Sequence, residues 1–332
     1  MQQNASGPGS ILRQGSSVNR LATDLEIIGA ESLGVRSLCC RVTLPDRRIV
    51  IDPGVALGYR RNGLLPHPYQ VAVGRRVRER IVEALGNATD VVFSHFHGDH
   101  VPLVVANPYQ LAVRSLPASF RHLRCWSKSG EGLSENMQKR FQDLTALSRT
   151  QWHVAEGRTE GPLSFSPAVP HGASGSRMGT VMMTRVALDR QSFVHASDIQ
   201  LLDDATVDRV LDWQPDVVLA AGPPLYLGRL STAARARAWN NAVRLARNIR
   251  HVILDHHLLR SEAGAVWLDR LSESVGKEIL CAADYMGQPR QLLEAQRVQL
   301  YEKMPVPEGW HAAYARGSVD PDAYLAGQPA GA

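Results

Sequence analysis

Short apolar runs separated by turn residues dominate the first third of the chain. They predict three consecutive strands at residues 25–30, 37–44 and 47–54. Apolar residues at helical spacing then predict a helix over roughly residues 70–86, and the run TDVVFSH predicts a short buried strand. The chain is therefore expected to begin with a sheet and one helix that covers it.

The pattern changes twice in the rest of the chain. Residues 102–150 are mostly helical in pattern, with Ser134 placed to cap a helix, and the last third alternates strands with helices. Strands first and alternation afterwards predict an α/β fold in which helices cover sheets, a layered sandwich. The later strands are expected at residues 152–156, 163–169, 179–188, 192–197, 216–222, 251–255 and 278–283, and the later helices at residues 203–213, 231–249, 261–275 and 286–304.

The two ends of the chain differ in composition from its middle. Residues 1–22 are rich in Gly, Ser, Asn and Gln and are expected to form a flexible N-terminal tail. Residues 23–305 are predicted to form a single domain, with the helical stretch at about 102–150 as an insertion. Residues 306–332 are then a C-terminal extension, of which the last part, from Ser318 onward, is expected to be loose.

The formal net charge of +5 suggests a basic protein, but arginine carries most of the positive charge and no block of like charges occurs. Arginines at helical spacing, as in RARAWNNAVRLARNIR, are typical of solvated helix faces, so nucleic acid is a partner that is not favoured. No apolar run has the length of a membrane span or of a signal-peptide core. The 4 cysteines are expected to be reduced thiols. We therefore expect a cytoplasmic protein without a membrane partner.

Candidate chemistry is concentrated in the segment VVFSHFHGDH. His95 and His97 alternate at the end of the predicted strand, so their side chains leave the same face. Gly98 allows a sharp turn, which directs Asp99 and His100 toward the same space. Imidazole and carboxylate groups at this density indicate a site for a first-row divalent metal.

Further candidate ligands follow other apolar runs. His171 stands where a strand gives way to a loop of small residues, Asp198 ends a second strand, and the pair His256 and His257 ends a third. Each position alone is a weak signal, but their joint occurrence in this order supports a shared site. Neighbours on a strand point to opposite faces, so only one of the paired histidines is expected to face the metals if the strand continues.

A strand followed by HxHxDH, then by a distant His, an Asp and a final His, resembles the metallo-β-lactamase superfamily. The segments ESLGVRSL, IDPGVALG, SPAVPHG, VHASD, AGPP and LDHHLLR more closely resemble an uncharacterised, mainly archaeal branch of that superfamily. The resemblance covers about residues 24–285. It implies the metallo-β-lactamase fold, an αββα sandwich with the metal site at one edge of its two sheets.

The resemblance also implies a set of ligands for two metals. His256 is favoured over His257 as the final ligand because it stands directly at the predicted strand end. Asp52, in VIDPG, would orient a histidine or the turn, and His195 is expected in the core or behind the ligands. The implied ligands are His95, His97 and His171 for the first metal, Asp99, His100 and either His256 or His257 for the second, and Asp198 as the bridge.

The implied activity is that of a dinuclear hydrolase. Two divalent metals about 3.5–4 Å apart would share a water and supply a bridging hydroxide near neutral pH. Zinc is the first expectation, with iron and manganese as alternatives, and Asp99 and Asp198 are the candidate catalytic carboxylates. The expected substrate is a small ester-like metabolite (a lactone or thioester) or a phosphorylated one. Superfamily members that hydrolyse β-lactams typically carry Arg or Cys in place of His100 and Asp198, so β-lactams are not expected.

Two other activities are alternatives on the same ligand set. One is a nuclease or phosphodiesterase of the same fold, which would need a groove for a polyanion. The other is an iron-dependent oxidoreductase. A binding protein with a vestigial site is disfavoured because the ligand set is complete.

Loops beside the predicted ligands supply the candidates for substrate contact. A small molecule is the expected partner, and the oligomeric state, including a homo-oligomer, is left open. The side chains that could contact an anionic substrate are those of Arg36, Tyr59, Arg177, Tyr226 and Arg260.

Overall fold

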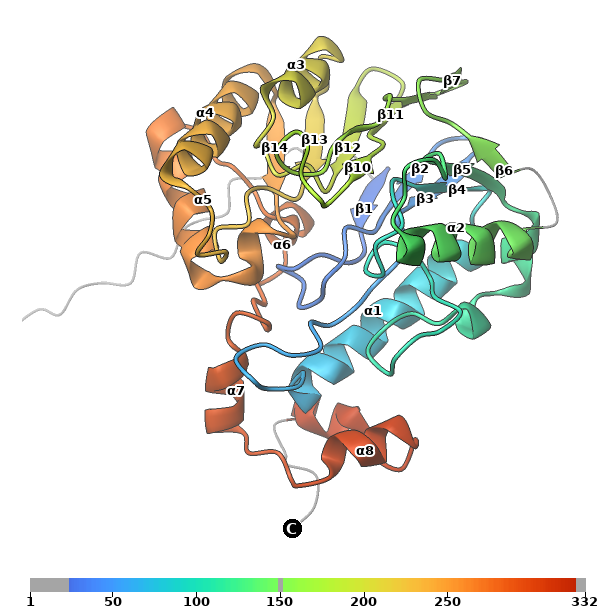
Figure 1. Cartoon of the computed structure of the whole chain (residues 1–332), viewed down its shortest axis with the longest axis vertical. Helices are drawn as coiled ribbons and strands as arrows, with labels where there is room; N and C mark the ends of the chain where they lie inside the picture. The colour runs from blue at the N-terminus through green and yellow to red at the C-terminus, as the bar shows by residue number, and fades with distance from the viewer. Residues whose placement is uncertain (1–23, 149–151, 327–332) are drawn as a thin grey trace, which may run out of the picture.

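Two six-stranded sheets, packed face to face, form the centre of the molecule in the computed structural model, which describes residues 24–148 and 152–326 (Figure 1). The first sheet has the strand order β1-β2-β3-β4-β5-β6 and the second has the order β14-β13-β12-β11-β8-β7, while β9 and β10 pair separately. The strands are β1 (Leu25–Ile27), β2 (Cys40–Thr43), β3 (Arg48–Ile51), β4 (Asp90–Phe93), β5 (Arg124–Ser127), β6 (Trp152–Val154), β7 (Thr159–Glu160), β8 (Leu163–Phe165), β9 (Val169–Pro170), β10 (Thr180–Val181), β11 (Thr184–Ala187), β12 (Ser192–Ser197), β13 (Val217–Ala220) and β14 (His251–Leu254).

Helices cover the outer face of each sheet (Figure 1). Helices α1 (Pro68–Gly86) and α2 (Glu135–Leu147) lie on the first sheet, and α3 (Asp204–Asp212), α4 (Thr232–Asn248) and α5 (Glu262–Val275) lie on the second. This arrangement confirms the predicted αββα sandwich. In the described part of the chain, no helix is both long and apolar enough to cross a membrane. The other helical segments are α6 (Ala282–Met286), α7 (Arg297–Lys303) and α8 (Trp310–Ala315), with 3-10 turns at η1 (Val113–Ser115), η2 (Ala118–His122), η3 (Leu258–Arg260) and η4 (Pro321–Ala326).

Strand β3 shows how the two-residue period of a strand builds the layers. Ile49 and Ile51 belong to the core between the two sheets, whereas Val50 belongs to the outer core beneath α1. Helix α1 meets that outer face with Val77 and Ile81, which lie one helical turn apart and are both buried. The apolar pattern of each element therefore determines which layer it joins.

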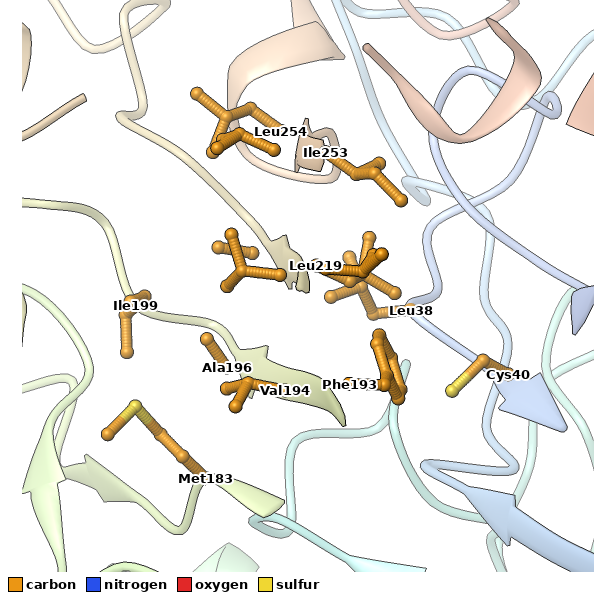
Figure 2. Close-up of a cluster of buried hydrophobic side chains, with 14 of the residues drawn as sticks. Leu38, Cys40, Met183, Phe193, Val194, Ala196, Ile199, Leu219, Ile253 and Leu254 are labelled. Atoms are coloured by element: carbon orange, nitrogen blue, oxygen red, sulfur yellow. The ribbon is translucent and has the colours of Figure 1, made fainter. Parts of the chain in front are cut away.

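The core between the sheets is continuous across the interface. Figure 2 shows Phe193 of β12 beside Cys40, the first residue of β2, and Leu38, which precedes that strand. All three side chains are fully buried. Burial of a large apolar side chain stabilises a fold by about 1.5–3 kcal/mol, so contacts of this kind hold the two sheets together.

Strand β5 lies within the stretch 102–150 that the sequence predicts to be mostly helical. The stretch does contain α2 and two short 3-10 turns, but residues Arg124–Ser127 pair with β4 and extend the first sheet. In this strand Cys125 faces the outer core and Trp126 the inner core. A run of four residues is too short for the alternation to stand out from its helical surroundings.

The segments predicted as a strand at 278–283 and a helix at 286–304 differ in the structure. Of the first, only Leu280 pairs, in a single bridge with Ile253, because Cys281 and Asp284 cap α6 reciprocally and begin a helix instead. Gly287, with φ +65°, then ends α6 in the left-handed conformation. The chain becomes helical again only at α7, since Pro289 interrupts the predicted helix.

The end of the C-terminal extension packs against the domain. The chain from Ser318 onward is predicted to be loose, yet Pro321–Ala326 form the 3-10 turn η4, in which Tyr324 is 1% exposed. Its ring lies 5.5 Å from that of His67 and 6.0 Å from that of Trp310. Residues 327–332 and the predicted flexible tail at 1–22 lie outside the described residues.

All four cysteines, Cys39, Cys40, Cys125 and Cys281, are buried and unpaired. Burial raises the pKa of the Cys125 thiol to about 12 and raises the pKa of each of the other three. The thiols are therefore protonated at neutral pH and pack as small apolar side chains.

Asp90, at the start of β4, is a buried carboxylate that ties three strands of the first sheet together. Its Oδ1 accepts hydrogen bonds from Arg47 Nη2 at 2.5 Å and Trp126 Nε1 at 2.9 Å. Its Oδ2 accepts from Thr89 Oγ1 at 2.6 Å and Arg124 Nη2 at 3.0 Å. Burial alone would raise the pKa of Asp90, but the hydrogen bonds from Arg47, Thr89 and Trp126 lower it below its ordinary value.

We predict that Asp90→Asn lowers the free energy of unfolding by about 3–5 kcal/mol, because Arg47 then remains buried without its carboxylate partner. Urea denaturation followed by tryptophan fluorescence measures the change. The matched control is Asp189→Asn, since Asp189 is 96% exposed and pairs only weakly with Arg190. Equal denaturation midpoints for the two variants would contradict the role assigned to Asp90.

Asp90 also makes the free energy of unfolding depend on pH. A carboxylate whose pKa is lower in the folded state stabilises the fold above its unfolded pKa, about 3.9, and loses that contribution as pH falls through the folded value. The unfolding free energy of Asp90→Asn should therefore fall less steeply below about pH 4 than that of the unmodified protein.

Candidate metal centre

The candidate centre lies where parallel strands of both sheets end. Strands β3 and β4 run parallel in the first sheet, and β12, β13 and β14 run parallel in the second, so their carboxyl ends gather at one edge. Asp52 directly follows β3, and Asp198 directly follows β12. The segment from His95 to His100 follows β4, and the paired histidines follow β14. His171 joins them from the loop after β9.

Unusual backbone conformations bring these ends together. Asp52 and Ser197 have φ values of +50° and +56°, which non-glycine residues seldom adopt. A Cβ atom on Gly54 would lie 2.1 Å from the backbone nitrogen of Val101 and 2.2 Å from the carbonyl carbon of His100. Only glycine therefore allows the loop after β3 to approach the histidine-bearing turn so closely.

The first group of ligand atoms comes from His95, His97, His171 and Asp198, whose atoms lie within 4.8 Å of one another. Nε2 of His95 is 2.9 Å from Nδ1 of His97, and Nε2 of His171 is 3.0 Å from Oδ2 of Asp198. Ligand atoms bound about 2.0–2.2 Å from one zinc ion would have comparable separations. The group therefore has the chemistry and spacing of a metal site.

The second group comes from Asp99, His100 and His256, again within 4.8 Å. Nε2 of His256 is 3.4 Å from Oδ2 of Asp99 and 3.8 Å from Oδ1 of Asp198. Nε2 of His100 is 3.1 Å from the same Oδ1. Asp198 thus presents Oδ2 to the first group and Oδ1 to the second.

His257 also faces the centre, which corrects the expectation that only one of the paired histidines does so. That expectation assumed a strand through both residues, but β14 ends at Leu254 and His256 and His257 lie in the following turn. Nε2 of His257 is 3.1 Å from Oδ2 of Asp198, on the side of the first group. His256 stands on the side of the second group, so the two imidazoles flank Asp198.

Burial and mutual charge determine the protonation of the centre. Burial lowers the pKa of His97 and of His256 to about 4, so both are neutral imidazoles at pH 7. Burial opposes the charge of His100, but the carboxylates of Asp198 and Asp52 raise its pKa well above its ordinary value. His100 in turn is the neighbour that most strongly lowers the pKa of Asp198, against the effect of burial.

Several buried polar atoms of residues at the centre lack hydrogen-bond partners. Among them are Nε2 of His100 and Oδ1 of Asp198, which lie 3.1 Å apart. Unsatisfied buried polar atoms are rare in folded proteins, and a cation coordinated by both would satisfy them. The residues present therefore fit a divalent metal.

A layer of hydrogen bonds behind the ligands fixes their orientation. Asp52 accepts hydrogen bonds from the backbone nitrogen and Oγ of Ser94, at 2.8 and 2.6 Å, and contacts Nδ1 of His100 at 2.9 Å. With Nδ1 of His100 bonded to a carboxylate, Nε2 is left to face the centre. Ser94 Oγ also lies 2.9 Å from Nδ1 of His95 and 2.7 Å from Ser197 Oγ.

Sequence reasoning missed three of these supporting residues. Ser94 and Ser197 carry no signal beyond their position next to a candidate ligand, and Gln200, whose Nε2 is 3.3 Å from Nδ1 of His171, carries none. His195 is buried, and its Nε2 is 2.9 Å from the carbonyl oxygen of Leu38.

The candidates for substrate contact divide into three kinds. Arg260 reaches the ligands directly, with Nη2 3.3 Å from Oδ2 of Asp99, and Nη1 lies 3.4 Å from the hydroxyl of Tyr226. Arg36 instead forms a bidentate ion pair with the buried Glu294. The side chains of Tyr59 and Arg177 are exposed.

Solved structures resemble the chain over most of its length. An isothiocyanate hydrolase from Delia radicum gut bacteria is 15% identical, with 74% of this chain and 94% of that chain covered and a TM-score of 0.46. A metal-dependent hydrolase of the β-lactamase superfamily is 12% identical, with 77% and 94% covered and a TM-score of 0.48. The second of these structures carries the name of the superfamily that the sequence resembles, but both TM-scores are below 0.5, so sequence relatives decide the family.

Sequence relatives decide the family, although no protein-family model matches the chain. A UPF0282 protein of Methanosarcina mazei is 47% identical over 301 residues, which cover 91% of this chain and 99% of that protein. A UPF0282 protein of Thermococcus onnurineus is 32% identical over 291 residues, with 83% and 94% covered. These archaeal relatives confirm the predicted branch, and the chain belongs to the UPF0282 protein family.

Proposed function

We propose that this protein is a metal-dependent hydrolase with two divalent metal ions, zinc being the first expectation. The observation that carries the proposal is the position of the Asp198 carboxylate between two groups of ligand atoms. One of its oxygens faces each group, and the carboxylate is 1% exposed. A buried carboxylate shared in this way suits a bridging ligand between two metals.

The seven residues implied by the sequence resemblance are the proposed ligands, with His256 as the final one. His256 is chosen because its Nε2 faces Asp99 and Oδ1 of Asp198, whereas His257 faces the other oxygen. The ligands are His95, His97 and His171 for the first metal, Asp99, His100 and His256 for the second, and Asp198 for both.

Bound metals would lower the pKa of a shared water toward neutrality and polarise a carbonyl or phosphoryl oxygen. The protein's own side chains provide the route by which a substrate approaches and a negative charge beside the metals. His97 and Asp99 are partly exposed while the other proposed ligands are buried, so a substrate reaches the centre over these two residues. Burial opposes the charge of Asp99, but His256, His100 and Arg260 lower its pKa well below its ordinary value. Asp99 therefore remains ionised and can accept a hydrogen bond from an entering water.

A panel of lactones, thioesters and phosphodiesters tests the proposal. We expect the zinc-loaded protein to hydrolyse at least one class, and Asp99→Asn to reduce that rate at least about a hundredfold, a barrier increase of ~2.7 kcal/mol. Asp189→Asn, on the exposed surface, is the matched control and should retain the full rate.

Other outcomes would replace the proposal. Cleavage confined to oligonucleotides, with an affinity that falls steeply with salt, would indicate a nuclease. Iron in the purified protein, together with oxygen consumption and no hydrolysis, would indicate an oxidoreductase.

We predict two zinc ions per chain after reconstitution, and we predict that Asp198→Ala loses the second metal more readily than the first. The first group keeps three histidines in that variant, whereas the second keeps Asp99 and two histidines of which His100 has lost a carboxylate partner. Elemental analysis after dialysis measures both quantities. Retention of two metals and full activity by Asp198→Ala would show that Asp198 is not the bridge.

The paired histidines should behave differently. We predict that His256→Ala removes the second metal, because it removes a ligand atom beside Asp99. His257→Ala should keep two metals but weaken the support of Asp198, since Nε2 of His257 lies 3.1 Å from Oδ2. Zinc content and thermal unfolding of the two variants distinguish these effects. The reverse pattern would assign the ligand role to His257.

A further inference from the structure

Arg260 places a guanidinium group among the proposed ligands of the second metal. The residue ends the 3-10 turn η3, and its side chain is 8% exposed. Its Nη2 lies 2.5 Å from Nε2 of His256 and 3.3 Å from Oδ2 of Asp99. An arginine side chain has only donors, so Nε2 of His256 must accept this hydrogen bond.

This hydrogen bond and a metal bond at His256 exclude each other. A neutral imidazole has one nitrogen with a free lone pair, and that lone pair cannot serve a guanidinium N–H and a metal ion together. A zinc ion would also lie about 2.0–2.2 Å from the nitrogen, in the space that Nη2 occupies at 2.5 Å. In the structure, therefore, the arginine supplies positive charge where the second metal would bind.

Glu31 is a second partner of Arg260, because it faces Nε whereas Nη2 faces the ligands. Its Oε2 lies 3.4 Å from Nε of Arg260, and the residue is 1% exposed. Neither carboxyl oxygen of Glu31 has a hydrogen-bond partner, and Nε of Arg260 lacks one as well. Burial, followed by the nearby charge of Glu294, raises the pKa of Glu31 to about 8. An unsatisfied buried carboxyl group is unfavourable, and a guanidinium that turned toward it would satisfy both side chains.

We propose that Arg260 is an internal cation that competes with the second metal, and that the second metal binds when the guanidinium withdraws from Asp99 and His256 to Glu31. The inference rests on the proposed two-metal site but is independent of the substrate. With Arg260 turned to the ligands, Asp99 keeps a positive partner while only the first metal is bound. Occupancy of the second metal site then depends on whether the guanidinium of Arg260 contacts Asp99 and His256 or turns to Glu31.

Zinc titration of the full-length protein, in competition with a chromophoric chelator, tests the proposal. Arg260→Met removes the competitor, and we expect the second zinc to bind at least about fivefold more tightly. Glu31→Gln removes the carboxyl group that can ionise when Arg260 turns toward it, and we expect the second zinc to bind at least about fivefold more weakly, with the first unchanged. The affinity for the second zinc is expected to rise in one variant and fall in the other, whereas a general loss of packing would lower it in both.

Arg61→Met is the matched control. Arg61 lies in the same region, with its guanidinium 5.1 Å from the centre of the Tyr226 ring, and its Nη2 donates to the carbonyl oxygen of Arg260 at 3.0 Å. The variant removes one positive charge and leaves the guanidinium of Arg260 in place. Its affinity for the second zinc should stay within about twofold of that of the unmodified protein.

The result that overturns the proposal is a second-site affinity that is unchanged or weaker in Arg260→Met. If the unmodified protein holds a single zinc, the proposal requires Arg260→Met to gain a second, and failure to gain it overturns the proposal equally. Loss of the proposed function shows in a different measurement, the absence of zinc-dependent hydrolysis by the unmodified protein.

Discussion

The edge of the sandwich is organised around the burial of one carboxylate. Asp198 is almost completely removed from water, and an ionised carboxylate in that position is stable only with compensating charge. Imidazole nitrogens surround it at 3.0–3.8 Å, and most of them belong to rings that burial keeps neutral. Neutral nitrogens are ligands and weak hydrogen-bond partners, but they do not balance a negative charge. The charge of His100, whose pKa the neighbouring carboxylates raise, offsets part of the negative charge of Asp198. The two-metal proposal assigns the rest of the compensation to bound metal ions.

The same edge joins the two sheets through a short chain of hydroxyl and carboxylate contacts. Ser94, at the end of β4, contacts Asp52 from the first sheet and Ser197 from the second. Asp52 and Ser197 both hold a left-handed backbone conformation that their residue types disfavour. Strain of this kind persists only where the surrounding structure enforces it. Here Asp52 donates its backbone N–H to the carbonyl oxygen of Val92, and Ser197 accepts from the backbone N–H of Ala221. Hydrogen bonds between neighbouring strand ends thus hold an unfavourable backbone geometry beside the candidate ligands.

Much of this arrangement could be predicted from local patterns, and the rest depended on contacts between distant segments. Alternation and helical spacing predicted the layers, and strand-end position singled out the residues that the structure brings together. Only one of the paired histidines is expected to face the centre if a strand runs through both, and that condition is not met because β14 ends at Leu254, where its pairing with β13 ends. The buried charges were missed for a similar reason. Arg36 and Glu294 are separated by 258 positions, and Glu31 meets Arg260 across a comparable distance in the chain.

The buried cysteines have a practical consequence for metal chemistry. Thiolates bind zinc strongly, and in many proteins accessible cysteines obscure the stoichiometry of a weaker site. Here each sulfur is buried in the core and carries its proton at neutral pH, so these thiols are not expected to bind zinc in the folded protein. Zinc that the folded protein retains therefore reports on nitrogen and oxygen ligands. Buried, protonated thiols also react slowly with alkylating reagents. A single cysteine engineered on the surface would therefore be a selective attachment point for a spectroscopic label.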